Sequence, residues 1–211
     1  MPRGSKSPKT VKQREEGSSL AVGLVLGVIL GAALAYFLLE FSESRYVLEN
    51  VERGSVEVNL LFNQEYPDFV SRLMERSNKS IYVIMYVMKY DPKEDPSRDP
   101  VNYLISQLVK AKNRGVDVRV IVDDVTKQSY PDTITYLKSE GVPVRLDPRA
   151  GVTTHTKMVI LDGEWVVLGS HNWTESALSS NNEGSVVLRS KDLAEKATEY
   201  FIELWDEGRS P

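Results

Sequence analysis

The residues best suited to chemistry lie in one stretch, HTKMVILDGEWVVLGSHNWTESALSSNNE, which starts at His155. Lys157 follows two positions later, and side chains two apart on an extended strand point to the same face. Ser170 and Asn172 repeat this spacing just after the next expected strand. A hairpin turning at residues 162–163 would bring the two pairs side by side. One imidazole, one ammonium and two neutral hydrogen-bonding groups are then expected to converge.

This combination of groups suits a phosphate ester. The cation and the amide can hold the phosphoryl oxygens while the imidazole attacks the phosphorus atom. No cluster of acidic residues accompanies these groups, so the segment does not resemble a Mg²⁺ site. The chain also has no cysteine and only two histidines, which excludes a cysteine nucleophile, a disulfide scaffold and a thiolate metal site. We therefore expect phosphoryl chemistry.

A known family signature fits the spacing of these residues. The segment resembles the HKD signature of the phospholipase D superfamily, with the pattern His155-x-Lys157-x4-Asp162-x6-Gly169-Ser170-x-Asn172. Two earlier runs, RGVDVRVIVDD at 114–124 and EGVPVRLD at 140–147, are similar to the segments that precede the signature in that family. The resemblance covers about residues 56–205.

The resemblance implies a role for each matching residue. His155 would be the nucleophile that forms a phosphohistidine, in a reaction that needs no metal and no cofactor. Lys157 and Asn172 would bind the phosphoryl oxygens, assisted by Ser170. Glu183 would hydrogen-bond the histidine ring and fix its tautomer.

The remaining residues of the segment are expected to play supporting roles. Asp162 and Gly169 belong to the signature, and the turn position of Asp162 indicates a structural role. His171 has no lysine two residues later, so it does not start a second motif. We interpret it as a surface residue or a residue behind the site.

A single copy of the motif has a consequence for assembly. The resemblance implies two motifs per active site, one histidine attacking and the other protonating the leaving oxygen, and this chain carries one motif. We therefore predict a homodimer whose two motifs meet at a two-fold interface. The chain resembles the short bacterial endonucleases and the membrane-anchored mitochondrial members of the superfamily.

The elements that must position these residues alternate between strands and helices. Continuous apolar runs predict buried strands, and apolar residues three or four apart predict amphipathic helices. Strands are expected at 56–62, 81–88, 116–122, 142–146, 157–161, 165–168 and 185–189, and helices at 67–77, 101–114, 132–140 and 193–205. The predicted fold class is α/β with a mixed β-sheet flanked by helices, phospholipase D-like, and preceded by one transmembrane helix.

The N-terminal part differs in composition. Residues 1–19 form a basic tail, residues 20–39 are apolar and uncharged, residues 40–55 form a charged connector, and residues 56–211 form the catalytic domain. An apolar helix of this length, at about 1.5 Å per residue, would span the roughly 30 Å hydrocarbon core. The positive-inside rule then predicts a single-pass membrane protein with an extracytoplasmic catalytic domain. A cleaved signal peptide is the alternative, because residues 33–35, Ala-Leu-Ala, have the form of a cleavage site.

Three functions are compatible with these features. The leading hypothesis is a metal-independent endonuclease with DNA or RNA as substrate, because the lipid enzymes of the family are usually longer and carry two motifs. The alternative is a phospholipase D or transphosphatidylase acting on membrane phospholipid, which the apolar segment favours. The third is a tethered protein that holds phosphate without turnover. Residues 40–211 carry 21 basic and 28 acidic residues, and this balance argues against a general nucleic-acid coat.

Overall fold

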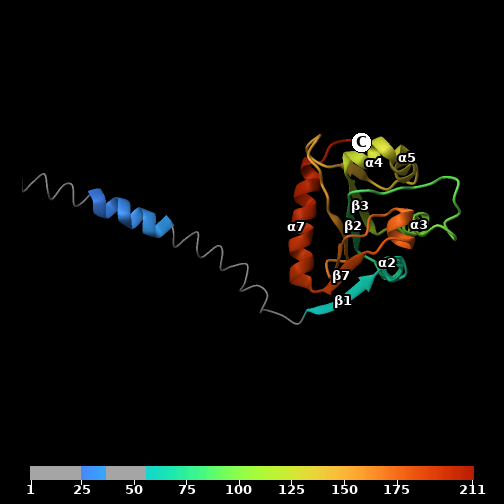
Figure 1. The fold of residues 1–211 in the computed structure, drawn as a ribbon, viewed down its shortest axis with the longest axis horizontal. Helices are drawn as coiled ribbons and strands as arrows, with labels where there is room; N and C mark the ends of the chain where they lie inside the picture. The colour runs from blue at the N-terminus through green and yellow to red at the C-terminus, as the bar shows by residue number, and fades with distance from the viewer. Residues whose placement is uncertain (1–24, 37–55) are drawn as a thin grey trace, which may run out of the picture. The chain divides into compact units, whose positions relative to one another are not determined.

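The computed structural model describes residues 25–36 and 56–211 (Figure 1). The chain divides into two compact units, Met1–Gly54 and Ser55–Pro211. In the first unit the described residues form one helix, over 25–36. The basic tail predicted at 1–19 and the connector predicted at 40–55 lie outside the described residues.

The predicted localisation, a single-pass membrane protein with an extracytoplasmic catalytic domain, is wrong by this structure. No helix in the described part of the chain combines the length and the apolar character needed to cross a bilayer.

The second unit is built on one seven-stranded sheet with the order β1-β7-β6-β5-β2-β3-β4. The pairs β2–β3 and β3–β4 are parallel, and the pairs from β1 through β7, β6 and β5 to β2 are antiparallel. The predicted mixed α/β fold is thereby confirmed. The strands in chain order are β1 Glu57–Phe62, β2 Ser80–Met85, β3 Asp117–Val122, β4 Val144–Leu146, β5 Lys157–Leu161, β6 Trp165–Gly169 and β7 Gly184–Arg189.

Helices cover both faces of this sheet. Figure 1 shows α7 along one face and α2 and α3 on the opposite side. Because both faces are covered, the central strands β2, β3 and β5 bury side chains pointing in both directions. The helices are α2 Glu65–Arg76, α3 Pro100–Asn113, α4 Asp124–Ser129, α5 Pro131–Ser139, α6 Glu175–Ser179 and α7 Lys191–Glu207.

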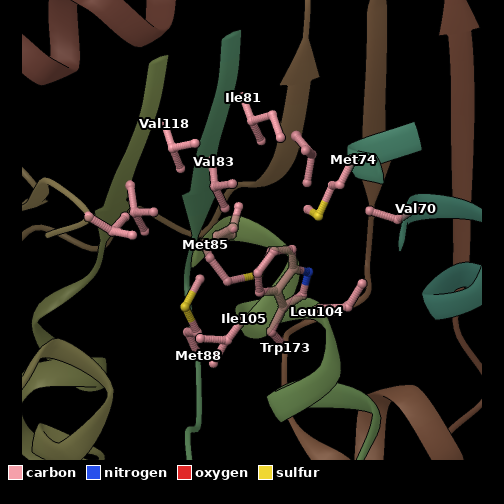
Figure 2. Packing of buried hydrophobic residues seen from close by; sticks show 14 of the residues in the cluster. Val70, Met74, Ile81, Val83, Met85, Met88, Leu104, Ile105, Val118 and Trp173 are labelled. Atoms are coloured by element: carbon pink, nitrogen blue, oxygen red, sulfur yellow. The ribbon is translucent and has the colours of Figure 1, made fainter. Parts of the chain in front are cut away.

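The larger core lies between the sheet and α2 and α3. Figure 2 shows Trp173 packed among Met85, Met88 and Leu104, and all four side chains are fully buried. The smaller core lies under α7, where Phe201 packs on the other face of the sheet. Burial of this kind contributes about 25 cal/mol for each Å² of apolar surface removed from water.

The two helices that the sequence did not predict, α4 and α6, are six and five residues long. Such short helices show too little of the 3.6-residue period to be recognised from spacing. Both begin at a capping residue, since Asp123 accepts the Val125 N–H and Thr174 accepts the Ala177 N–H.

The strand register brings the segments that carry the site to one edge of the sheet. In the antiparallel series the start of β5, the end of β6 and the start of β7 lie at the same edge. The end of β2 lies there too, because Met85 pairs with Lys157. The loops that follow or precede these strand ends therefore meet.

Candidate active site

His155 and Lys157 form the centre of the site. His155 is exposed on the loop before β5, and Lys157, the first residue of β5, is only 6% exposed. The Nζ atom of Lys157 lies 3.1 Å from Nδ1 and 3.2 Å from Nε2 of His155. The same ammonium donates a hydrogen bond to the His155 carbonyl oxygen at 2.8 Å. The structure therefore places the predicted nucleophile and the predicted phosphate-binding cation in direct contact.

The surroundings of Lys157 alter its acidity. Burial lowers the pKa of the Lys157 ammonium from its ordinary value, and the negative charge of Glu183 acts in the opposite direction. Within residues 56–211 no carboxylate lies at ion-pair distance from this ammonium. An under-solvated cation of this kind is suited to attract a phosphate anion.

Ser170 and Glu183 form a second pair at the same edge. The Ser170 hydroxyl donates to the Glu183 carboxylate and accepts the Gly184 N–H at 3.1 Å. The other carboxylate oxygen accepts a hydrogen bond from Asn181 Nδ2 at 3.0 Å. No hydrogen bond joins Glu183 to the ring of His155 in the described part of the chain. The role that the resemblance implies for Glu183 is therefore not formed within a single chain of this structure.

Asn172 is held by the chain segment that follows β2. Its Oδ1 atom accepts the N–H of Val87 at 3.2 Å. Trp173, next in the sequence, donates its N–H to the Val87 carbonyl at 3.0 Å and accepts the Lys89 N–H at 2.8 Å. This pairing leaves the Asn172 NH₂ group as the free donor of its amide, with no partner among residues 56–211.

Asp162 and Gly169 have structural surroundings. Asp162 adopts φ 57° in the β5–β6 turn, and its carboxylate accepts the backbone N–H groups of residues 78, 79 and 80 at 3.2, 2.9 and 3.1 Å. At Gly169 an added Cβ would lie 2.1 Å from Ser185 Oγ and 2.4 Å from the Gly184 carbonyl oxygen. Only glycine allows β6 and β7 to approach this closely beside Ser170.

His171 is a buried residue behind the site, which is the second of the two positions expected for it. Its ring stacks on Tyr66 with centroids 4.4 Å apart and is 0% exposed. Its Nδ1 lies 2.8 Å from Ser185 Oγ, and its Nε2 lies 3.1 Å from the Asn63 carbonyl oxygen. Burial lowers the pKa of the His171 imidazole, which favours the neutral ring.

Two residues of the site went unrecognised in the sequence. Tyr86 directly follows β2. The centroid of its ring lies 4.4 Å from the centroid of the His155 ring and 4.8 Å from Lys157 Nζ. Asp123, after β3, accepts the Thr154 N–H at 2.7 Å and so anchors the loop that leads to His155. Tyr86 could not be recognised because it lies within a continuous apolar run. Asp123 could have been noticed, because an aspartate before a helix is a capping signal.

The side chains gathered at the site are of the types that can bind a phosphate group. Over residues 25–36 and 56–211, no group of three or more His, Asp or Glu side chains is placed to hold a metal ion. The groups present are an exposed imidazole, an adjacent ammonium, an amide and a hydroxyl. A mixed sheet that presents this set at one edge defines a phosphoryl-transfer protein of the phospholipase D type.

Comparison with known proteins places the chain in a family. Residues 70–205 match the family model described as cardiolipin synthase, PLD-like domain. The chain therefore belongs to the phospholipase D superfamily, which confirms the family predicted from the motif. The predicted enzyme class, a phosphodiesterase of this superfamily, agrees with this membership.

Individual relatives agree with this membership. Mitochondrial cardiolipin hydrolase of Chlamydomonas reinhardtii is 34% identical over 99 residues, which are 47% of this chain and 44% of the relative. The chain thus matches less than half the length of that relative. Phospholipase D of Rickettsia prowazekii is 23% identical over 200 residues, covering 89% of this chain and 90% of its own length. The crystal structure of a phospholipase D family member, Nuc from Salmonella typhimurium, has 27% identity and a TM-score of 0.61, covering 74% of this chain and 97% of that one.

Proposed function

We propose that this chain is a metal-independent endonuclease that hydrolyses the phosphodiester bonds of DNA or RNA through a phosphohistidine on His155. The observation that carries the proposal is the contact between the exposed His155 ring and the buried Lys157 ammonium. The ammonium is placed to draw a phosphate oxygen to within reach of the imidazole. Holding nucleophile and electrophile together in this way supplies a large part of a catalytic effect.

The proposed reaction has two steps. In the first, a ring nitrogen of His155 forms a bond to phosphorus, the bond to the leaving oxygen breaks, and that oxygen takes a proton from an imidazolium. In the second, water attacks the phosphohistidine, the phosphorus–nitrogen bond breaks, and the neutral imidazole accepts the proton from water. Lys157, Asn172 and Ser170 hold the phosphoryl oxygens through both steps. The reaction thus needs a second histidine for the proton.

A second copy of the chain supplies that histidine in this proposal. His171 cannot serve, because both ring nitrogens contact internal groups and the side chain is fully buried. We therefore propose that the active form is a homodimer in which two copies of His155 face one phosphate. Each phosphate then meets one nucleophile and one general acid.

An exposed apolar surface beside the site supports this assembly. Val58, Leu60 and Phe62 on β1 are 61%, 56% and 55% exposed, and Leu168 on β6 is 40% exposed. Leu60 and Leu168 share a face, because both pair with Val186 on β7. The surface borders the site, because Leu168 precedes Gly169 and Ser170 directly. Contiguous apolar surfaces of this kind mark interaction sites.

Nucleic acid is the preferred substrate because of the architecture of the chain. The chain aligns with 97% of the Nuc structure at 27% identity, so the two share the same arrangement of one catalytic unit. Lipid is the second candidate, because curated relatives at 34% identity are named as cardiolipin hydrolases. Both substrates are phosphodiesters, so the chemistry at His155 is shared and the substrate has to be tested directly.

The test incubates the full chain in excess EDTA with single-stranded DNA, duplex DNA, RNA and cardiolipin vesicles. We expect cleavage of at least one nucleic acid, and a loss of more than about 10³-fold in kcat for His155→Asn, because the nucleophile is removed. Thr153→Asn, an exposed neighbour, serves as the matched control and should retain activity.

Two outcomes would contradict the proposal. Hydrolysis of cardiolipin without cleavage of any nucleic acid would establish the lipid alternative in its place. Loss of all activity in EDTA with recovery on adding Mg²⁺ would contradict the phosphohistidine mechanism.

A further inference from the structure

Tyr86 occupies a central position that the proposed mechanism does not yet use. It directly follows β2, and its N–H donates to the Thr156 carbonyl oxygen at 3.0 Å. Thr156 is the residue between His155 and Lys157. The main chain of Tyr86 is thus fixed opposite the centre of the catalytic pair.

The ring of Tyr86 contacts both members of that pair. Its centroid lies 4.4 Å from the centroid of the His155 ring, with the two planes tilted by 54°. The Nζ atom of Lys157 lies 4.8 Å from the same centroid. A cation at this distance from an aromatic ring is attracted by the electron-rich face, most strongly where water is excluded.

Other contacts to the two catalytic groups are few. Among residues 56–211, the Lys157 ammonium has no ion-pair partner, and its hydrogen bonds go to His155 alone. The His155 ring likewise contacts only Lys157 through its nitrogens in that part of the chain. The Tyr86 ring is therefore a shared support for the buried Lys157 ammonium and the exposed His155 imidazole.

We propose that Tyr86 is a positioning residue whose aromatic ring holds the His155 imidazole and the Lys157 ammonium in the arrangement that attacks phosphorus. This inference rests on the proposed function of the site. The role belongs to the ring, because the Tyr86 hydroxyl has no hydrogen-bond partner among the described residues. A phenylalanine at this position should therefore keep the positioning role, whereas an aliphatic side chain should lose it.

The experiment compares Tyr86→Phe and Tyr86→Leu in the full chain, with bis-p-nitrophenyl phosphate as substrate and EDTA present. We expect Tyr86→Phe to keep kcat close to wild type. Tyr86→Leu should lower kcat by about 10²-fold, because the catalytic pair is misplaced, with a smaller change in KM. The alkaline limb of its pH profile should also move to lower pH, because the Lys157 ammonium loses the attraction of the ring.

Folding and function are separated by controls. Thermal unfolding is measured for each variant, and Tyr86→Met, which fills the space without an aromatic face, replaces Tyr86→Leu if the leucine variant unfolds. An unchanged kcat and alkaline limb in the leucine or methionine variant would overturn the positioning role alone. Equal losses in the phenylalanine and leucine variants would assign the role to the hydroxyl and also overturn the inference. An inactive wild-type chain would overturn the proposed function and this inference together.

Discussion

Lys157 is a buried cation, and its pKa and its effect on stability follow from that burial. The side chain is 6% exposed, and burial lowers its pKa below the ordinary value of 10.5. Glu183 partly offsets this effect through its negative charge. In the window between the folded pKa and 10.5 the unfolded chain binds more protons, so the free energy of unfolding rises with pH there. The charged Lys157 ammonium is therefore the form that attracts a phosphate, and burying it lowers the free energy of unfolding.

We predict that activity on a phosphodiester falls on the alkaline side as Lys157 loses its proton, at a pH below 10.5. Glu183→Gln removes the charge that raises the pKa, so the alkaline limb should move to still lower pH. The measurement is kcat/KM against pH for wild type and variant. Glu195→Gln, an exposed change on α7, is the control and should leave the limb in place. A limb that stays fixed in Glu183→Gln would show that Lys157 does not set it.

The β5–β6 turn shows how an element supports the site without touching the substrate. Asp162 sits at φ 57°, a conformation that Asp, Asn and Gly tolerate best. Its carboxylate accepts three backbone N–H groups at the start of β2. The turn thus connects the hairpin that carries Lys157 to the strand that leads to Tyr86.

We predict that Asp162→Ala lowers the free energy of unfolding by about 1–3 kcal/mol, because it leaves these N–H groups without their acceptor. Asp162→Asn keeps an acceptor oxygen and the tolerance for positive φ, so it should lose less. Urea unfolding monitored by circular dichroism measures both variants. An alanine variant as stable as wild type would show that water replaces the carboxylate fully.

At the scale of the whole molecule, the proposed dimer makes activity a property of two chains. We predict that mixing equal amounts of wild type and His155→Asn, with subunit exchange complete, leaves about a quarter of the activity by random assortment. A residual of about one half would mean that each chain works alone. The measurement is the rate on a phosphodiester at fixed total protein.

Leu60→Glu, which places a charge on the apolar surface of β1, should yield an inactive monomer by sedimentation, whereas Leu60→Ala should remain dimeric.

Much of the site could be predicted because its residues are close together in the chain. His155, Lys157, Asp162 and Ser170 lie within one hairpin, so their spacing alone indicates phosphate chemistry. The strands around them were also predicted within a few residues, because apolar runs encode burial locally. The roles assigned to the site residues stay predictions until the variants are measured.

The sequence by itself determined the motif, the family and the α/β class, since each depends on neighbouring residues. Tertiary structure alone decided which distant residues join the site. Tyr86 reaches His155, and Asp123 reaches Thr154, through the register of β2, β3 and β5. It also decided that His171 is buried behind the site. The periodicity of apolar residues along the chain indicates which side chains face the core and which face solvent. Strand register and helix ends depend on packing across the whole fold, and spacing along the chain does not encode that packing.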